Sequence, residues 1–457
     1  MTLTSIDPAS GQVVATWATD GEREVGAALS RSAAAFGEWS RASFEARGAV
    51  LRRAAELLRA EGPAHARLMA QEMGKPLSQG RAEVEKCAWA CEHYAAIAAA
   101  ELASQPVATE GFTSHVAFLP LGPVLAVMPW NFPFWQVLRF AAPNLMAGNT
   151  ALLKHASNVQ GCARAIESLL RRAGLPPDAF INLAVEGAVV AALIARPQVA
   201  AVTLTGSTTA GRAVGRAAGE ALKKSVLELG GSDPYVVLAD ADVERAAESC
   251  VASRLINTGQ SCIAAKRFIV VEPARARFTE AVVERMRAAT QGPPLLQPEV
   301  ALGPQARADL RDELHAQVEA SVARGSRLLL GGRRPPGEGA FYPPTVLDDV
   351  RPGVPAFDEE TFGPVAAIVP ARDEDDALRL ANSGVFGLGA ALFTADAERG
   401  ARLAEQRLEA GSCCVNDFVR SDPRLPFGGI KASGYGRELG TFGLREFVNV
   451  KTVCVRR

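Results

Sequence analysis

The sequence has no surplus of charge of either sign and no long uncharged hydrophobic run. Its 49 Lys and Arg residues are matched by 50 Asp and Glu residues, so it lacks the basic surplus of proteins that bind nucleic acid or anionic membranes. The apolar stretch Ala95–Ala100 is short and ends at Glu101, well below the length of a membrane span. The beginning of the chain contains no apolar segment of the kind found in signal peptides. We therefore expect a cytoplasmic protein whose partners include neither nucleic acid nor a membrane.

Histidine is scarce, and the cysteines are scattered. The five histidines form no pair at metal-ligand spacing. Cys87 and Cys91 lie four residues apart on one face of a predicted helix, where buried thiols are a commoner interpretation than a metal site. We therefore expect no metal. In a chain without a secretory signal, the eight cysteines indicate reduced thiols, and any redox role of Cys413 or Cys414 stays open.

Predicted strands alternate with predicted helices after an α-rich opening. A chain of 457 residues is expected to form two or three domains. In the first half the predicted strands are Val124–Met128, Thr150–Lys154, Ile181–Val185, Ala200–Thr205 and Val226–Leu229, and the predicted helices between them are Val159–Ala173, Val189–Ala195 and Arg212–Leu222. A second unit of the same kind follows residue 268. This alternation predicts an α/β fold with open parallel sheets.

The stretch Asn257–Ile263, which reads NTGQSCI, is the best candidate for chemistry. It places Cys262 just after a glycine-containing turn between two apolar runs. A thiol in such a turn can share a substrate carbon with its own backbone N–H, so that the thiolate attacks while the N–H stabilises the oxyanion. Taken alone, Cys262 is more often an inert buried thiol.

Two other residues have side chains suited to the same reaction. Asn131 lies in the proline-bounded loop PWNFP after a predicted strand, where its amide can donate to an oxyanion; a turn-forming asparagine is the alternative. Glu228 is flanked by leucines and followed by Gly230 and Gly231. Apolar neighbours raise the pKa of a carboxyl group toward the range of a general base, although a strand glutamate that faces solvent is the commoner case.

A dinucleotide site is indicated by weaker signals. Gly206 and Ser207 open a helix after a strand, and helix N-termini bind phosphates; an ordinary strand–helix turn is the alternative. Lys154 ends another predicted strand, at the edge of an α/β sheet where ligands bind, or it is simply a solvated strand end. Because Ser157 is not acidic, it would not repel a ribose 2′-phosphate, which favours NADP. Glu360 and Phe362 have side chains suited to a ribose and a nicotinamide ring, or they are a surface glutamate and a core phenylalanine.

Seven motifs together resemble the NAD(P)-dependent aldehyde dehydrogenase superfamily over essentially the whole chain. In order they are PWNFP, the strand that ends at Lys154, LTGS, LELGG, NTGQSC, EETFGP and PFGGIKASGYGRE. Within the superfamily, the chain is most similar to bacterial succinate-semialdehyde dehydrogenases. The resemblance implies an aldehyde dehydrogenase-like fold, with two Rossmann-like open-sheet domains and a β-hairpin oligomerisation arm.

The resemblance also assigns roles. It implies that Cys262 is the nucleophile, that Asn131 and the Cys262 N–H form the oxyanion hole, and that Glu228 activates the deacylating water. The cofactor, NADP or NAD, would be bound by Trp130, Lys154, Ser157, Gly206, Ser207, Leu229, Glu360 and Phe362.

The implied substrate is a small aldehyde that carries a carboxylate. In similar succinate-semialdehyde dehydrogenases an arginine at the position of Arg139 binds that carboxylate, and Ser421 adds a hydroxyl. Some members carry a second arginine six residues before the nucleophile, where this chain has Ile256. A broader semialdehyde or aliphatic aldehyde dehydrogenase is therefore the alternative. Glu228 argues against a related acyl-transfer enzyme, which passes the acyl group from its thioester to coenzyme A or phosphate and not to water. The presence of Cys262, Asn131 and Glu228 together argues against a non-catalytic protein that has the fold without the activity.

The resemblance further implies a domain order. Residues 1–100 and 122–230 are expected to form the cofactor-binding domain, and residues 231–440 the catalytic domain. Residues 101–121 and 441–457 are expected to form the oligomerisation arm of a homodimer or homotetramer. The last strand-like segment, Gly443–Val455, is expected to pair with the earlier hairpin or with a neighbouring subunit.

Overall fold

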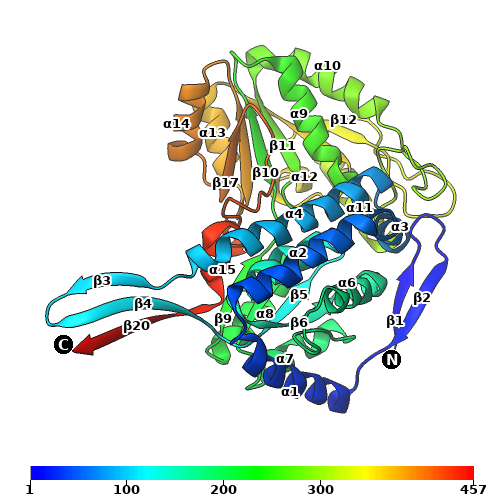
Figure 1. Ribbon diagram of the computed structural model, residues 1–457. Helices are drawn as coiled ribbons and strands as arrows, with labels where there is room; N and C mark the ends of the chain where they lie inside the picture. The colour runs from blue at the N-terminus through cyan, green and yellow to red at the C-terminus, as the bar shows by residue number, and fades with distance from the viewer. Residues whose placement is uncertain (1, 457) are drawn as a thin grey trace.

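The computed structural model describes residues 2–456, in which two open α/β sheets lie next to each other and a three-stranded arm extends from the body (Figure 1). The first sheet has the strand order β19-β9-β8-β5-β6-β7, parallel except for β19 at its edge. Its strands are β5 (Pro123–Met128), β6 (Thr150–His155), β7 (Phe180–Asn182), β8 (Ala201–Thr205), β9 (Lys224–Glu228) and β19 (Gly434–Tyr435).

Helices cover both faces of this sheet because successive strand residues point to opposite sides. In β5, Leu125 packs into the core beneath one set of helices, whereas Val124 and Ala126 pack into the core on the other face. The first set is α1 (Glu22–Trp39), α7 (Val190–Ala195) and α8 (Thr208–Glu220). The second set is α2 (Phe44–Ala60), α3 (Gly62–Met73), α4 (Leu77–Glu101), α5 (Trp135–Ala147) and α6 (Gln160–Arg172).

The second sheet has the order β12-β13-β14-β11-β10-β16-β17, parallel except for β12. Its strands are β10 (Asp233–Val237), β11 (Ala265–Val271), β12 (Arg327–Leu330), β13 (Thr345–Asp348), β14 (Val365–Ala371), β16 (Gly389–Phe393) and β17 (Ser412–Val415). Helices α9 (Val243–Leu255) and α10 (Glu272–Ala288) lie on one face, and α13 (Glu374–Asn382) and α14 (Ala397–Arg407) on the other (Figure 1). Helices α11 (Ala308–Ala323) and α12 (Pro355–Asp358) complete this unit. The predicted α/β class with two open sheets is confirmed.

The arm is an antiparallel sheet of β3 (Gln105–Thr109), β4 (Phe112–Pro120) and β20 (Val448–Arg456), in the order β20-β4-β3. The predicted pairing of the C-terminal segment with the hairpin is therefore present. The segment begins later than expected, because residues 443–446 belong to helix α15 (Gly440–Glu446). Gly443 permits this turn of helix, since a Cβ atom there would lie 2.6 Å from the carbonyl carbon of Glu438.

Smaller elements complete the fold. An N-terminal hairpin of β1 (Thr2–Ile6) and β2 (Val13–Ala18) was not expected from the α-rich opening, and β15 (Phe386–Gly387) pairs with β18 (Ile430–Lys431) where the two sheets meet. The carboxyl ends of β5, β6, β8 and β9 lead into Pro129, Ala156, Gly206 and Leu229. These are the segments that the sequence predicts to hold ligands.

Candidate active site

Cys262 follows a strained turn. Asn257, Thr258 and Gly259 have backbone φ angles of 53°, 56° and 76°, all in the left-handed region that non-glycine residues rarely adopt. Glycine is required at position 259, since a Cβ atom there would lie 2.2 Å from the carbonyl carbon of Gly363. The buried Arg254 guanidinium donates a hydrogen bond of 2.5 Å to the Gly259 carbonyl oxygen. The turn is thus over-determined, as strained turns at functional sites usually are.

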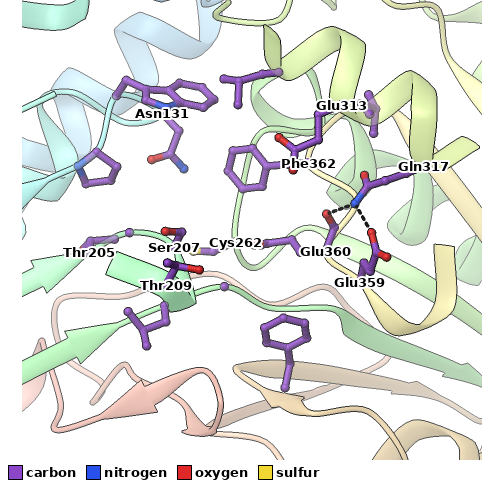
Figure 2. Close-up of a pocket in the computed structure, with 18 of the residues that line it drawn as sticks. Asn131, Thr205, Ser207, Thr209, Cys262, Glu313, Gln317, Glu359, Glu360 and Phe362 are labelled. Carbon is purple, nitrogen blue, oxygen red and sulfur yellow. Dashed lines mark hydrogen bonds between the residues drawn. The ribbon is translucent and has the colours of Figure 1, made fainter. Parts of the chain in front are cut away.

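Two cavities meet at Cys262. One of about 570 Å³ lies beside the loops after β5, β8 and β9, and Figure 2 shows Asn131, Ser207, Glu360 and Phe362 around Cys262 in it. The other, of about 820 Å³, lies beside α4 and α5. Among the described residues, Cys262 alone lines both cavities. A molecule in either cavity therefore reaches the same sulfur atom.

The surroundings of Cys262 favour the neutral thiol over the thiolate. Burial raises the pKa of the Cys262 thiol to about 12, although the nearby cations Arg139 and Lys266 oppose this rise. Lys266 is itself buried, and its Nζ donates to the carbonyl oxygens of Cys262 at 2.7 Å and Ser261 at 3.0 Å. Lys266 therefore fixes the backbone that carries the sulfur. Sequence reasoning missed Lys266, because a lysine at the start of a strand has no distinctive pattern.

Asn131 is held with its amide facing the first cavity (Figure 2). Its side-chain Nδ2 donates to the Gln260 backbone carbonyl oxygen at 3.1 Å. The backbone carbonyl oxygen of Asn131 accepts from Asn257 Nδ2 at 2.7 Å. One amide hydrogen thus ties the loop to the cysteine turn, and the other is left to donate. Asn131 and Cys262, whose side-chain amide and backbone N–H are predicted to form the oxyanion hole, both line this cavity.

A buried ion pair supports the Asn131 loop from behind. Lys75 Nζ contacts Glu83 Oε2 at 2.5 Å and donates to the Asn131 carbonyl oxygen at 2.9 Å. Glu83 also accepts the backbone N–H groups of Phe134 and Trp135, each at 2.9 Å. These N–H groups lie at the start of α5, where a carboxylate satisfies unpaired donors and complements the helix dipole. Sequence reasoning missed this pair because its partners lie far apart in the chain.

Glu228 is at the end of β9, fully enclosed, and lines neither cavity. Desolvation, followed by the nearby Glu438 carboxylate, raises the pKa of Glu228 well above its usual value. Neither of its carboxylate oxygens has a hydrogen-bond partner among the described residues. A turn of this side chain toward Cys262 would therefore break no hydrogen bond.

Six of the eight predicted cofactor residues lie together on the first cavity: Trp130, Gly206, Ser207, Leu229, Glu360 and Phe362. The Ser207 hydroxyl caps α8 by accepting from the Ala210 N–H at 3.2 Å. Glu360 accepts from the Gly231 N–H at 3.1 Å and lies 3.5 Å from Lys266 Nζ. A Cβ atom at Gly230 would lie 2.5 Å from Glu360 Oε2, so glycine makes room for this carboxylate.

This arrangement fits a dinucleotide. The N-terminus of α8 suits a pyrophosphate, the Glu360 carboxylate suits ribose hydroxyls, and Phe362 with Leu229 supplies apolar surface for a ring. Phe362 is held edge-to-face against Trp130, with ring centroids 5.7 Å apart. The lining also includes Thr209, Glu313 and Gln317, which sequence reasoning did not identify.

Lys154 and Ser157 do not line this cavity. Lys154 is the penultimate residue of β6, where burial lowers the pKa of its amine. Ser157 is exposed at the start of the 3₁₀ turn Ser157–Val159. Both lie at or just beyond the carboxyl end of the strand next to β5, at the same end of the sheet as the cavity.

Arg139 and Ser421 both line the second cavity, as the substrate assignment requires. Arg139 is buried, forms an ion pair with Glu438 through Nε, and donates to Thr205 Oγ1 at 3.2 Å. Ser421 Oγ accepts from Lys86 Nζ at 2.7 Å. Ile256 lines this cavity too and adds no charge. Aromatic walls are supplied by Trp89, Phe132, Trp135, Phe418 and Phe427.

The comparisons with known proteins agree with this geometry. The aldehyde dehydrogenase family matches residues 1–453. The chain belongs to the aldehyde dehydrogenase family. It is 49% identical to an NAD(P)+ succinate semialdehyde dehydrogenase of Escherichia coli, with 98% of this chain and 97% of that protein covered. A probable NADP+ succinate-semialdehyde dehydrogenase of Synechocystis is 46% identical over the full length of both chains.

Solved structures show the same fold. A crystal structure of succinic semialdehyde dehydrogenase from Streptococcus pyogenes with NADP+ superposes with a TM-score of 0.97, at 34% identity, with both chains fully covered. The predicted family and fold are thus confirmed. In this aldehyde dehydrogenase, no helix within residues 2–456 is long and apolar enough to cross a membrane, and the same residues contain no His, Cys, Asp or Glu cluster suited to a metal.

Proposed function

We propose that this aldehyde dehydrogenase oxidises succinate semialdehyde to succinate, with NADP or NAD as the oxidant. The observation that carries the proposal is the position of Cys262 between two cavities, one suited to a dinucleotide and the other lined by Arg139 and Ser421. Relatives named as succinate-semialdehyde dehydrogenases, at 44–49% identity over nearly the whole chain, support the choice of substrate.

The proposed reaction starts with loss of the Cys262 proton and attack of the sulfur on the aldehyde carbon. The resulting thiohemiacetal oxyanion accepts hydrogen bonds from the free Asn131 amide hydrogen and the Cys262 N–H. When bound, the oxidised nicotinamide supplies the hydride acceptor and a positive charge beside the thiol. Loss of hydride from the carbon leaves a thioester on Cys262. Water deprotonated by Glu228 then adds to the thioester, releases the acid and regenerates the thiolate.

The NADP preference is part of the proposal. Ser157 brings no negative charge to the end of β6, and Lys154 brings a positive one, so a ribose 2′-phosphate is tolerated there. Relatives named for NADP+ support this reading. The proposal also includes the domain division, with residues 1–100 and 122–230 as the cofactor-binding domain and residues 231–440 as the catalytic domain. It further includes residues 101–121 and 441–457 as the contact of a homodimer or homotetramer, and a cytoplasmic location.

A broader semialdehyde or aliphatic aldehyde dehydrogenase is the second candidate. It is favoured by the uncharged Ile256 and by the cavity of about 820 Å³, which is larger than a four-carbon substrate needs.

Initial rates of cofactor reduction with succinate semialdehyde, glutarate semialdehyde, butanal and benzaldehyde, each with NAD and NADP, separate the two candidates. We expect kcat/KM for succinate semialdehyde to exceed that for butanal by about 100-fold or more, as a charge-assisted carboxylate contact provides. The variant Cys262→Ala should lose turnover yet still quench its tryptophan fluorescence on binding NADPH. Equal rates for charged and uncharged aldehydes would leave the broader activity as the function.

A further inference from the structure

We propose that Lys86, together with Ser421, forms the charged contact for the substrate carboxylate. This inference rests on the proposed function and names the residue that gives it specificity. Lys86 projects from α4 into the second cavity. Its Nζ donates to Ser421 Oγ at 2.7 Å and lies 4.4 Å from the centre of the Trp135 ring. The ammonium group is therefore held in place at the cavity wall.

The charges around the cavity point to Lys86 as a contact in addition to Arg139. Arg139 already forms a buried ion pair with Glu438, and Arg420 is paired with Asp417, with Nη1 and Oδ2 2.8 Å apart. Lys86, by contrast, forms no ion pair with any residue between 2 and 456; its partners there are a hydroxyl and an aromatic ring.

The carboxylates of Glu83 and Asp422, which act on the charge of Lys86, already form ion pairs with other cations. Glu83 pairs with Lys75, and Asp422 pairs with Arg424 at 2.7 Å. Among the described residues that line this cavity, Lys86 is thus the cation that has no ion-pair partner, and a carboxylate that leaves water needs such a charge.

The hydrogen bond between Lys86 and Ser421 also sets up the second donor. Because the Ser421 oxygen accepts from the ammonium group, its own hydrogen is free to donate into the cavity. Lys86 keeps two further N–H donors. Together they offer two charge-assisted contacts to the two oxygens of one carboxylate, in the cavity that Cys262 also lines. The class of ligand is a short linear aldehyde with a carboxylate at its far end.

The decisive experiment measures, with NADP, the ratio of kcat/KM for succinate semialdehyde to kcat/KM for butanal. This substrate ratio is compared among Lys86→Met, Lys86→Arg and the wild type. We expect Lys86→Met to lower this ratio by about 10- to 100-fold, mainly through KM for the charged substrate. Lys86→Arg should restore most of it, because the positive charge returns. The matched control is Arg81→Met, which removes an exposed cation of α4 that lines neither cavity.

Succinate supplies a readout without turnover. It should slow alkylation of Cys262 by iodoacetamide, and about tenfold more succinate should be needed in Lys86→Met than in the wild type. An unchanged substrate ratio in Lys86→Met, or an equal loss for both aldehydes, would overturn the inference while leaving the proposed function in place. A wild type that does not prefer the charged aldehyde would instead refute the proposed function.

A pH series gives a further check. Burial, and then the charge of Arg139, lowers the pKa of Lys86 to about 8, while Cys87, Glu83 and Asp422 act in the opposite direction. Since a lysine loses its charge above its pKa, the substrate ratio of the wild type should fall as the pH rises above about 8. In Lys86→Arg the ratio should stay level, because arginine remains charged.

Discussion

Glu228 is the residue that we propose as the base for the second half of the reaction. Burial and the nearby Glu438 carboxylate raise the pKa of Glu228, which makes its carboxylate a stronger base, and among the described residues neither of its oxygens has a hydrogen-bond partner. A carboxylate acts as a base only when deprotonated, so thioester hydrolysis should accelerate with rising pH until the Glu228 pKa is passed.

We expect Glu228→Gln to slow steady-state turnover by about 100- to 10,000-fold, the usual contribution of a general base. Hydride transfer should still occur once per site, so a burst of NADPH equal to the enzyme concentration should precede the slow phase in stopped-flow absorbance. Glu220→Gln, at an exposed glutamate at the end of α8, is the control. A full steady-state rate in Glu228→Gln would assign the base to another group.

At the scale of single residues, the sequence predicts the functional residues that lie in short motifs. It does not predict those that act through contacts with residues far away in the chain. Cys262, Asn131 and Glu228 stand in recognisable local contexts. Lys75 supports Asn131 from 56 positions away, and Lys86 meets Ser421 across 335 positions. Such contacts exist only once α4 has packed against the loops of both sheets, so no local pattern encodes them.

At the scale of elements, the central strands were predictable because buried parallel strands are short apolar runs. The predicted strand Thr150–Lys154 matches β6, and Ala200–Thr205 matches β8, to within one residue. Helix α8 begins at Thr208, earlier than the predicted Arg212, because Ser207 caps it. The two-residue strand β19 was not predictable, because Gly434 pairs with Glu228 from 206 positions away.

The turn before Cys262 leaves no room for a side chain at Gly259. We expect Gly259→Ala to reduce the free energy of unfolding by about 1–3 kcal/mol, since alanine disfavours the φ of 76° and its Cβ collides with the Gly363 backbone. Any shift of the turn also displaces the sulfur. The measurements are urea unfolding and the rate of Cys262 alkylation.

Gly37→Ala is the matched control for this prediction. Gly37 lies inside α1, and a Cβ atom there meets nothing within 4 Å. That substitution should stabilise the protein by about 0.5–1 kcal/mol, with an unaltered alkylation rate. Equal stability of Gly259→Ala and the wild type would show that the turn tolerates a side chain.

At the scale of the whole molecule, the arm has little core of its own. Its strands expose the apolar side chains of Val107, Phe112, Leu119, Val450 and Val455, and β3 and β20 are its open edges. Exposed apolar groups on an extended sheet favour a protein contact, which supports the proposed homo-oligomer.

Deletion of residues 448–457 should therefore lower the mass measured by sedimentation velocity to that of a shortened monomer, below the 48.1 kDa of the full chain, because it removes β20 and leaves the edge of β4 unpaired. Leu222→Asn is the control, since Leu222 is a fully exposed apolar residue on the body, away from the arm. An unchanged mass after the deletion would place the subunit contact elsewhere.

The meeting of two cavities at Cys262 has a kinetic consequence. Exposed residues line each cavity, Glu359 the first and Arg420 the second, so each has its own mouth to solvent. Neither ligand has to pass the other on its way in or out. The order of addition is then set by affinity and not by obstruction, and an inhibitor that plugs the aldehyde mouth should leave the Kd of the dinucleotide unaltered.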